Sequence, residues 1–170
     1  YESSSTSPPA AFVTAMKAAE NFLDAAISTS IHVTIHVGFG EVNGQALGSG
    51  ALGESETSGA LFNYTQVRTA LLSAASSPDD FVSTSVLPIS DPTSGGQFFV
   101  SSALEKALGL GGGATIDGYI GLSSTEPFTF DPNNRSVAGK YDAVGVAEHE
   151  MTEVLGRISG LSASPSNQYA

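Results

Sequence analysis

Val144-Gly-Val-Ala-Glu-His-Glu-Met-Thr-Glu-Val-Leu-Gly-Arg-Ile-Ser-Gly160 is the segment around which the chain is organised. With about 100° per residue, His149 and Glu153 lie one helical turn apart on one face, and Glu150 lies at its edge. We therefore expect a helix with one packed side and a polar side bearing a histidine and two carboxylates. Its packed side is an apolar stripe with helical spacing: Val144, Ala147, Met151, Val154, Leu155 and Ile158.

The composition excludes several classes of function. The chain has 170 residues, enough for one domain with a hydrophobic core. It carries 17 Asp and Glu against 6 Lys and Arg, a net charge of -11, which disfavours nucleic acids and anionic membrane surfaces as partners. It has no cysteine, so disulfides, cysteine zinc fingers and thiol nucleophiles are excluded. No apolar run is long enough to span a membrane.

The same composition points to an exported protein. Few lysines and many Ser, Thr, Gly and Ala residues favour a bacterial protein that is secreted, extracellular or periplasmic. We interpret residues 1–9 as a polar leader and residues 10–170 as a single domain. No signal peptide is visible in the leader, so we expect one, if it existed, to have been removed.

The remaining periodicities predict an α+β fold with a mixed twisted sheet packed on an N-terminal helix and on the helix of His149. Residues 40–60, rich in glycine and serine, are expected to form a loop with a short strand. The other predicted elements are helices at 10–27, 64–75 and 101–109, a helical turn from 77, and strands at 31–39, 98–100, 114–123 and 128–130.

Two more histidines lie on the polar side of the predicted strand 31–39. His32 and His36 are four residues apart, which in a strand is roughly 13 Å. A zinc ion with histidine ligands at about 2.1 Å cannot join both. We interpret them as polar residues on a sheet face.

The central segment resembles a known family. His149-Glu150-Met-Thr-Glu153-Val-Leu-Gly156 is similar to the zincin helix H-E-x-x-H and the metzincin pattern H-E-x-x-H-x-x-G-x-x-H. With Arg157 added, it resembles a group of exported bacterial metalloprotease-like proteins that carry H-E-[I/M]-[S/T]-E-[V/I]-[L/M]-G-R. The stretches Lys106–Leu110 and Ile116–Gly121 look like that group too.

This resemblance implies a zincin-like fold and a zinc-dependent metallopeptidase that cleaves peptides or proteins. His149 and Glu153 would be zinc ligands, although another divalent metal is compatible with Glu153 in place of a histidine. Glu150 would be the general base that takes the proton of the metal-bound water. Tyr119 and Gly121 would lie in a strand that flanks the cleft and pairs with an extended substrate.

The third metal ligand is the open question. Ser159 stands where the metzincin pattern has its last histidine. A domain truncated at its C-terminus is our first explanation, and a substitute ligand such as Ser159, His32 or His36 is the second. If the site is incomplete, the alternative function is a non-catalytic, acidic secreted module for binding or adhesion that keeps the zincin-like fold.

Overall fold

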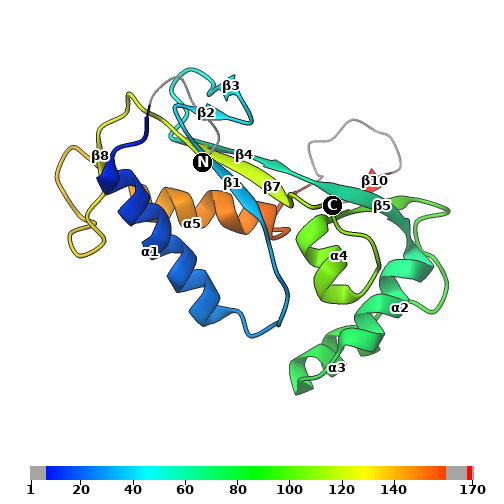
Figure 1. Cartoon of the computed structure of the whole chain (residues 1–170). Coiled ribbons are helices and arrows are strands. Elements are labelled where there is room, and N and C mark those ends of the chain that lie inside the picture. Colours follow the sequence, from blue (N-terminus) through cyan, green and yellow to red (C-terminus); the bar gives the residue numbers. More distant parts are fainter. Residues whose placement is uncertain (1–6, 160–167, 170) are drawn as a thin grey trace.

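A computed structural model describes residues 7–159 and 168–169 of the chain. It has an α+β fold, as the sequence predicted, with mixed sheets and separate helices (Figure 1). No helix in the described part is both long and apolar enough to cross a membrane.

The main sheet consists of β1 (Ile35–Phe39), β7 (Gly118–Leu122) and β4 (Gly53–Thr57), in the order β1-β7-β4. β7 is central: it runs parallel to β1 and antiparallel to β4. The sheet is therefore mixed, as predicted. Within the described residues β4 pairs only with β7, so its other edge is free.

Two helices cover one face of this sheet, α1 (Ala10–Ala26) and α5 (Ala143–Val154) (Figure 1). The core forms between them and the sheet, and its fully buried members include Phe12, Ile120, Leu122 and Val154. The apolar stripe predicted for α5 and the apolar side of the helix predicted at 10–27, which is α1, supply most of the buried residues, because both sides point inward.

A second sheet carries the outer part of the molecule. β5 (Gly59–Asn63) continues directly from β4 and pairs with β6 (Gln97–Ser101), which pairs on its other side with β10 (Gln168–Tyr169). The chain segments around it form α2 (Tyr64–Ala74), α3 (Pro78–Ser85) and α4 (Ser102–Leu108). Two short ladders complete the described fold: β2 (Glu41–Val42) with β3 (Gln45–Ala46), and β8 (Phe128–Thr129) with β9 (Tyr141–Asp142).

Several predicted boundaries need correction. The strand expected at 31–39 begins only at Ile35. Of the strand expected at 114–123, only the part that forms β7 is a strand. Residues 40–60, expected to be a loop with a short strand, contain all of β2, β3 and β4 and the start of β5. Glycines and charged residues give this region no apolar alternation, which is the pattern that predicts a strand. β4 forms all the same, because it pairs with β7.

The helix expected over 144–160 ends at Val154. Gly156 has a φ of 112°, a backbone conformation that disfavours residues with a Cβ. Its N–H donates to Glu153 O at 2.9 Å, and the Arg157 N–H donates to Thr152 O at 2.9 Å. These two hydrogen bonds form a Schellman motif, which satisfies the last carbonyls and turns the chain away.

Candidate metal-binding site

The start of α5 is fixed by an ion-pair network that no pattern in the sequence predicted. Asp142 caps the helix by accepting a hydrogen bond from the Val144 N–H at 3.1 Å. Arg135 lies 2.7 Å from Asp142 and 3.2 Å from Glu148, so it joins the cap to the next turn. The helix that carries the candidate site is thus anchored at its first turn and closed by the Schellman motif at its last.

The structure brings His149 and Glu153 together. His149 Nε2 lies 3.2 Å from Glu153 Oε1, and the side chains are 55% and 29% exposed. The other carboxylate oxygen of Glu153, Oε2, accepts a 2.6 Å hydrogen bond from the Ser55 hydroxyl on β4. A histidine nitrogen and a carboxylate oxygen are therefore held side by side at the solvent, next to a sheet edge.

Glu150 lies beneath this pair rather than at its edge, since it is only 6% exposed. Its side chain packs over Gly53 of β4, where a Cβ would stand 2.7 Å from Glu150 Oε1. Burial, followed by the charge of Glu153, raises the pKa of Glu150 from 4.5 to about 6. Within the described part of the chain, no hydrogen bond or ion pair reaches its carboxylate.

Arg157 binds to the last turns of α5 and stabilises the end of the helix. Its guanidinium donates to the His149 carbonyl at 3.2 Å and to the Thr152 hydroxyl at 2.8 Å. The Thr152 hydroxyl itself donates to the same carbonyl at 2.8 Å. These contacts place a positive charge at the C-terminal turn of α5, where the helix dipole favours it.

The two donors fit a zinc ion in part. Imidazole nitrogen and carboxylate oxygen are both zinc ligands, and two ligands of a tetrahedral zinc are roughly 3.4 Å apart. The 3.2 Å between His149 Nε2 and Glu153 Oε1 is close to that separation. In the part of the chain that the structure describes, no third His, Asp or Glu joins them.

The strand histidines do not complete the set. His36 lies on β1 with its ring edge-on to Tyr119, at a centroid distance of 5.4 Å. His32 precedes β1, and its carbonyl accepts a hydrogen bond from Lys106 Nζ at 3.2 Å. Neither joins His149 and Glu153 in a group of metal-ligating side chains within the described residues, and the expectation that one of them substitutes gains no support.

The substrate-pairing role expected for Tyr119 and Gly121 needs correction. Both edges of β7 are occupied, by β1 and β4, so its backbone has no free edge for a peptide. Tyr119 and Gly121 are also in register with Glu56 and Glu54, whereas Ser55 between these two faces α5. Because side chains alternate along a strand, both residues face away from α5. Among the described strands, the one that lies against α5 and has an unpaired edge is β4.

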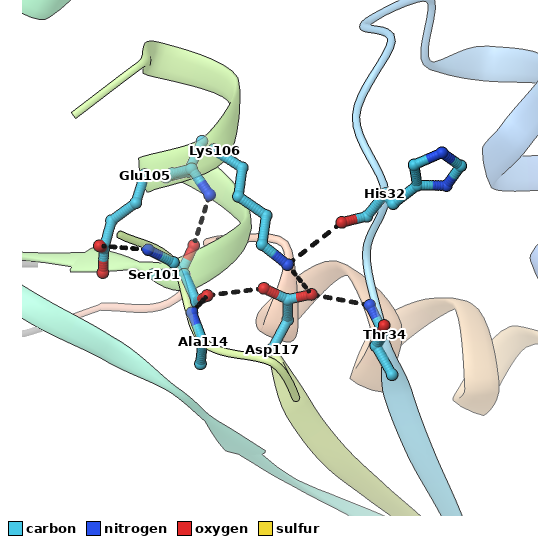
Figure 2. Close-up of polar contacts among 10 residues, drawn as sticks. His32, Thr34, Ser101, Glu105, Lys106, Ala114 and Asp117 are labelled. Atoms are coloured by element: carbon cyan, nitrogen blue, oxygen red, sulfur yellow. Dashed lines mark hydrogen bonds and ion pairs between the residues drawn. The ribbon is translucent and has the colours of Figure 1, made fainter. Parts of the chain in front are cut away.

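A second buried polar cluster was not predicted (Figure 2). Asp117 is fully buried, and its Oδ2 lies 2.7 Å from both Lys106 Nζ and the Thr34 N–H. Its Oδ1 accepts a 2.6 Å hydrogen bond from the Ser102 hydroxyl. Burial opposes the charge of Asp117, but the hydrogen bonds from Lys106, Ser102 and Thr34 outweigh it and hold the pKa of Asp117 below its ordinary value.

This Asp117 cluster joins segments that are far apart in the sequence. It holds the segment before β1 and helix α4 through the carboxylate of Asp117. It also holds the segment before β7, because the Ser102 hydroxyl accepts a hydrogen bond from the Ala114 N–H at 2.5 Å. The Asp117 carbonyl also accepts from the Ser58 N–H between β4 and β5, at 2.9 Å. The only signal in the sequence is that Lys106 and Asp117 fall in two stretches that resemble the same family as the α5 segment.

Neither cluster has the geometry of a serine hydrolase. At α5 the carboxylate of Glu153 stands between the Ser55 hydroxyl and the His149 ring, whereas a triad needs the histidine in contact with the serine. In the Asp117 cluster the candidate nucleophile, Ser102, is fully buried and out of reach of a substrate. Nucleophilic catalysis by serine is therefore a poor fit.

The chain matches no protein-family model, no curated protein and no solved structure. Its function therefore has to follow from the contacts within the chain.

Proposed function

We propose that this chain is the core of a zinc-dependent metallopeptidase with a zincin-like fold, in which His149 and Glu153 bind the metal and Glu150 is the general base. The observation that carries the proposal is the 3.2 Å approach of His149 Nε2 to Glu153 Oε1 from consecutive turns of one anchored helix. A third ligand would come from outside the described residues. When bound, zinc would lower the pKa of a bound water molecule toward 7 and polarise the peptide carbonyl.

The position of Glu150 supports the general-base role. A base works best when its pKa lies close to the working pH, and burial raises the pKa of Glu150 to about 6. Glu150 adjoins two features that a peptidase needs: it follows His149 of the donor pair on α5, and its side chain packs over Gly53 of β4, the strand whose outer edge no described strand pairs with. An extended peptide that added to this edge would be held by backbone hydrogen bonds beside the site.

The test of zinc binding uses the whole chain without chelator. Zinc titration followed by calorimetry should give about one equivalent per chain. Free zinc at about 100 times its Kd should raise the free energy of unfolding by about 2.7 kcal/mol, measured by urea denaturation. His149→Ala should remove this stabilisation, while Lys17→Ala on α1 should keep it.

The general base is tested separately. Glu150→Gln should retain zinc and lose cleavage of an unfolded protein substrate by a factor of about 10²–10⁴. A chain that binds no zinc, and that zinc does not stabilise, overturns the proposal. Zinc binding without any peptidase activity in the unsubstituted chain overturns only the enzymatic half.

The second candidate is a non-catalytic acidic module that keeps the same fold. The observation that favours it is that His149, Glu153 and Ser55 already satisfy one another, with no third metal ligand in the described residues. The free edge of β4 would then bind an extended partner without cleaving it. Binding of unfolded peptides that is equal in the unsubstituted chain and in Glu150→Gln, with no zinc bound, supports this function over the first.

A further inference from the structure

Ser55 is the one side chain of the sheet with a hydrogen bond to the carboxylate of Glu153 in the described part of the chain. It lies on β4, on the face toward α5, and it is half-buried. Its hydroxyl donates to Glu153 Oε2 at 2.6 Å, a short distance typical of a hydrogen bond to a charged acceptor. The contact joins residues 98 positions apart in the sequence.

We propose that Ser55 is a positioning residue for the metal centre, one that holds Oε2 of Glu153 so that Oε1 is presented beside His149 Nε2. This inference rests on the proposed function, because it gives a role to Ser55 at the same site. Glutamate has a long side chain with several rotamers, and fixing one of them in advance removes an entropic cost from metal binding. Hydrogen bonds to a metal-ligating carboxylate act in this way in metal sites generally.

A purely structural role for Ser55 is the competing explanation, and the neighbouring Thr57 separates the two. Thr57 lies on the same face of β4, two residues along, and its hydroxyl donates to Glu153 as well. That hydrogen bond, at 3.3 Å, goes to the main-chain carbonyl, so it holds the helix and leaves the carboxylate free. Thr57 is therefore a matched control on the same strand and against the same residue.

The experiment measures the zinc affinity of the whole chain by calorimetric competition with a chelator, and the melting temperature of the metal-free protein. Ser55→Ala should weaken zinc binding by about 10–100-fold. Thr57→Val should leave the affinity within about threefold, while both variants lower the metal-free melting temperature by similar amounts. In a Glu153→Ala background, Ser55→Ala should have no further effect on zinc affinity, because Ser55 acts through that carboxylate.

The outcomes distinguish this inference from the proposed function. If the unsubstituted chain binds zinc but Ser55→Ala binds it equally well, Ser55 has no positioning role and the metal site stands. Equal losses in Ser55→Ala and Thr57→Val, or a further loss in the Glu153→Ala background, show a general effect of the strand and overturn the inference. If the unsubstituted chain binds no zinc, the proposed function fails and this inference fails with it.

Discussion

Asp117 and Glu150 are both nearly inaccessible carboxylates, 0% and 6% exposed, yet their surroundings shift their pKa values in opposite directions. Asp117 has a lysine, a hydroxyl and a main-chain N–H as partners, and its pKa is lowered. Glu150 is buried close to the carboxylate of Glu153, and both effects raise its pKa to about 6. The fold stabilises one charge and destabilises the other.

This contrast separates a structural carboxylate from a candidate functional one. The carboxylate of Asp117 joins the segment before β1 to helix α4, so its charge is used to hold the fold together (Figure 2). Glu150 lies on the face of α5 next to the candidate metal donors and contributes no such link. A buried group that costs stability beside a pair of metal donors is a candidate for catalysis.

The largest expected effect comes from breaking the structural cluster. Asp117→Ala removes the acceptor of Lys106, Ser102 and the Thr34 N–H and leaves these donors buried or half-buried without it. We expect the free energy of unfolding to fall by about 3–5 kcal/mol, measured by urea denaturation at pH 7.

The control for this variant is an exposed aspartate. Asp24→Ala, near the end of α1, should change the free energy of unfolding by less than about 0.5 kcal/mol. If Asp117→Ala is equally mild, the hydrogen bonds of the Asp117 cluster are not what stabilises the fold, and the contrast with Glu150 disappears.

The second largest expected effect is a gain in the free energy of unfolding, and it comes from removing the charge of Glu150. Because folding raises the pKa of Glu150, the folded state holds the proton more tightly than the unfolded chain does. Stability from this group is therefore present below about pH 4.5 and is lost as the pH rises through about 6. Relative to the unsubstituted chain, Glu150→Gln should gain about 2 kcal/mol between pH 4 and pH 8.

Comparing two pH values cancels the constant cost of burying an amide in place of the carboxylate, so only the charge of Glu150 is measured. Glu20→Gln on the exposed side of α1 should show a difference of less than about 0.5 kcal/mol between the same pH values. If the difference in unfolding free energy between Glu150→Gln and the unsubstituted chain is the same at pH 4 and pH 8, the native carboxylate reaches solvent or a partner.

Much of the fold could be predicted because local patterns determine it. The apolar stripes of α1 and α5 indicated both helices that cover the sheet, and the start of α3 at Pro78 followed from the cap at Ser77. The helix predicted at 101–109 was also confirmed as α4, with Gly109 as its C-cap. A short strand was expected somewhere in residues 40–60, but β4 was not located, because its residues Gly-Glu-Ser-Glu-Thr carry no apolar alternation and the strand depends on β7.

The candidate site was predictable only as far as a single helix determines it. The spacing of His149 and Glu153 placed the two side chains together, and the structure confirms their proximity. Ser55 and Gly53 could not be found, because their contacts with α5 bridge almost a hundred residues of sequence. Tyr119 and Gly121 lie in the strand predicted for them, but the sequence does not reveal that this strand, β7, is central and has both edges paired.

The smallest expected effect concerns the space that allows Glu150 to be buried. A Cβ at Gly53 would stand 2.7 Å from Glu150 Oε1 and 2.8 Å from Val146 Cγ1, so the carboxylate or the helix must move. Gly53→Ala should lower the free energy of unfolding by about 1–2 kcal/mol at pH 5, where overpacking is the main cost. It should also flatten the pH dependence between pH 4 and pH 8, since a displaced carboxylate returns to water and to its ordinary pKa.

A double-mutant cycle separates the two contacts of Gly53. If Glu150 is the group displaced, Gly53→Ala should cost at least about 0.5 kcal/mol less in a Glu150→Ala background. A cost that is unchanged in that background would assign the clash to Val146 and leave Glu150 in place. The pH profile of the single variant would then keep its slope, and burial of Glu150 would not depend on the missing side chain at Gly53. In that case the space for Glu150 would come from the packing of α5 rather than from the glycine on the sheet. The opposite pKa shifts of Asp117 and Glu150 would then depend only on the groups that surround each carboxylate.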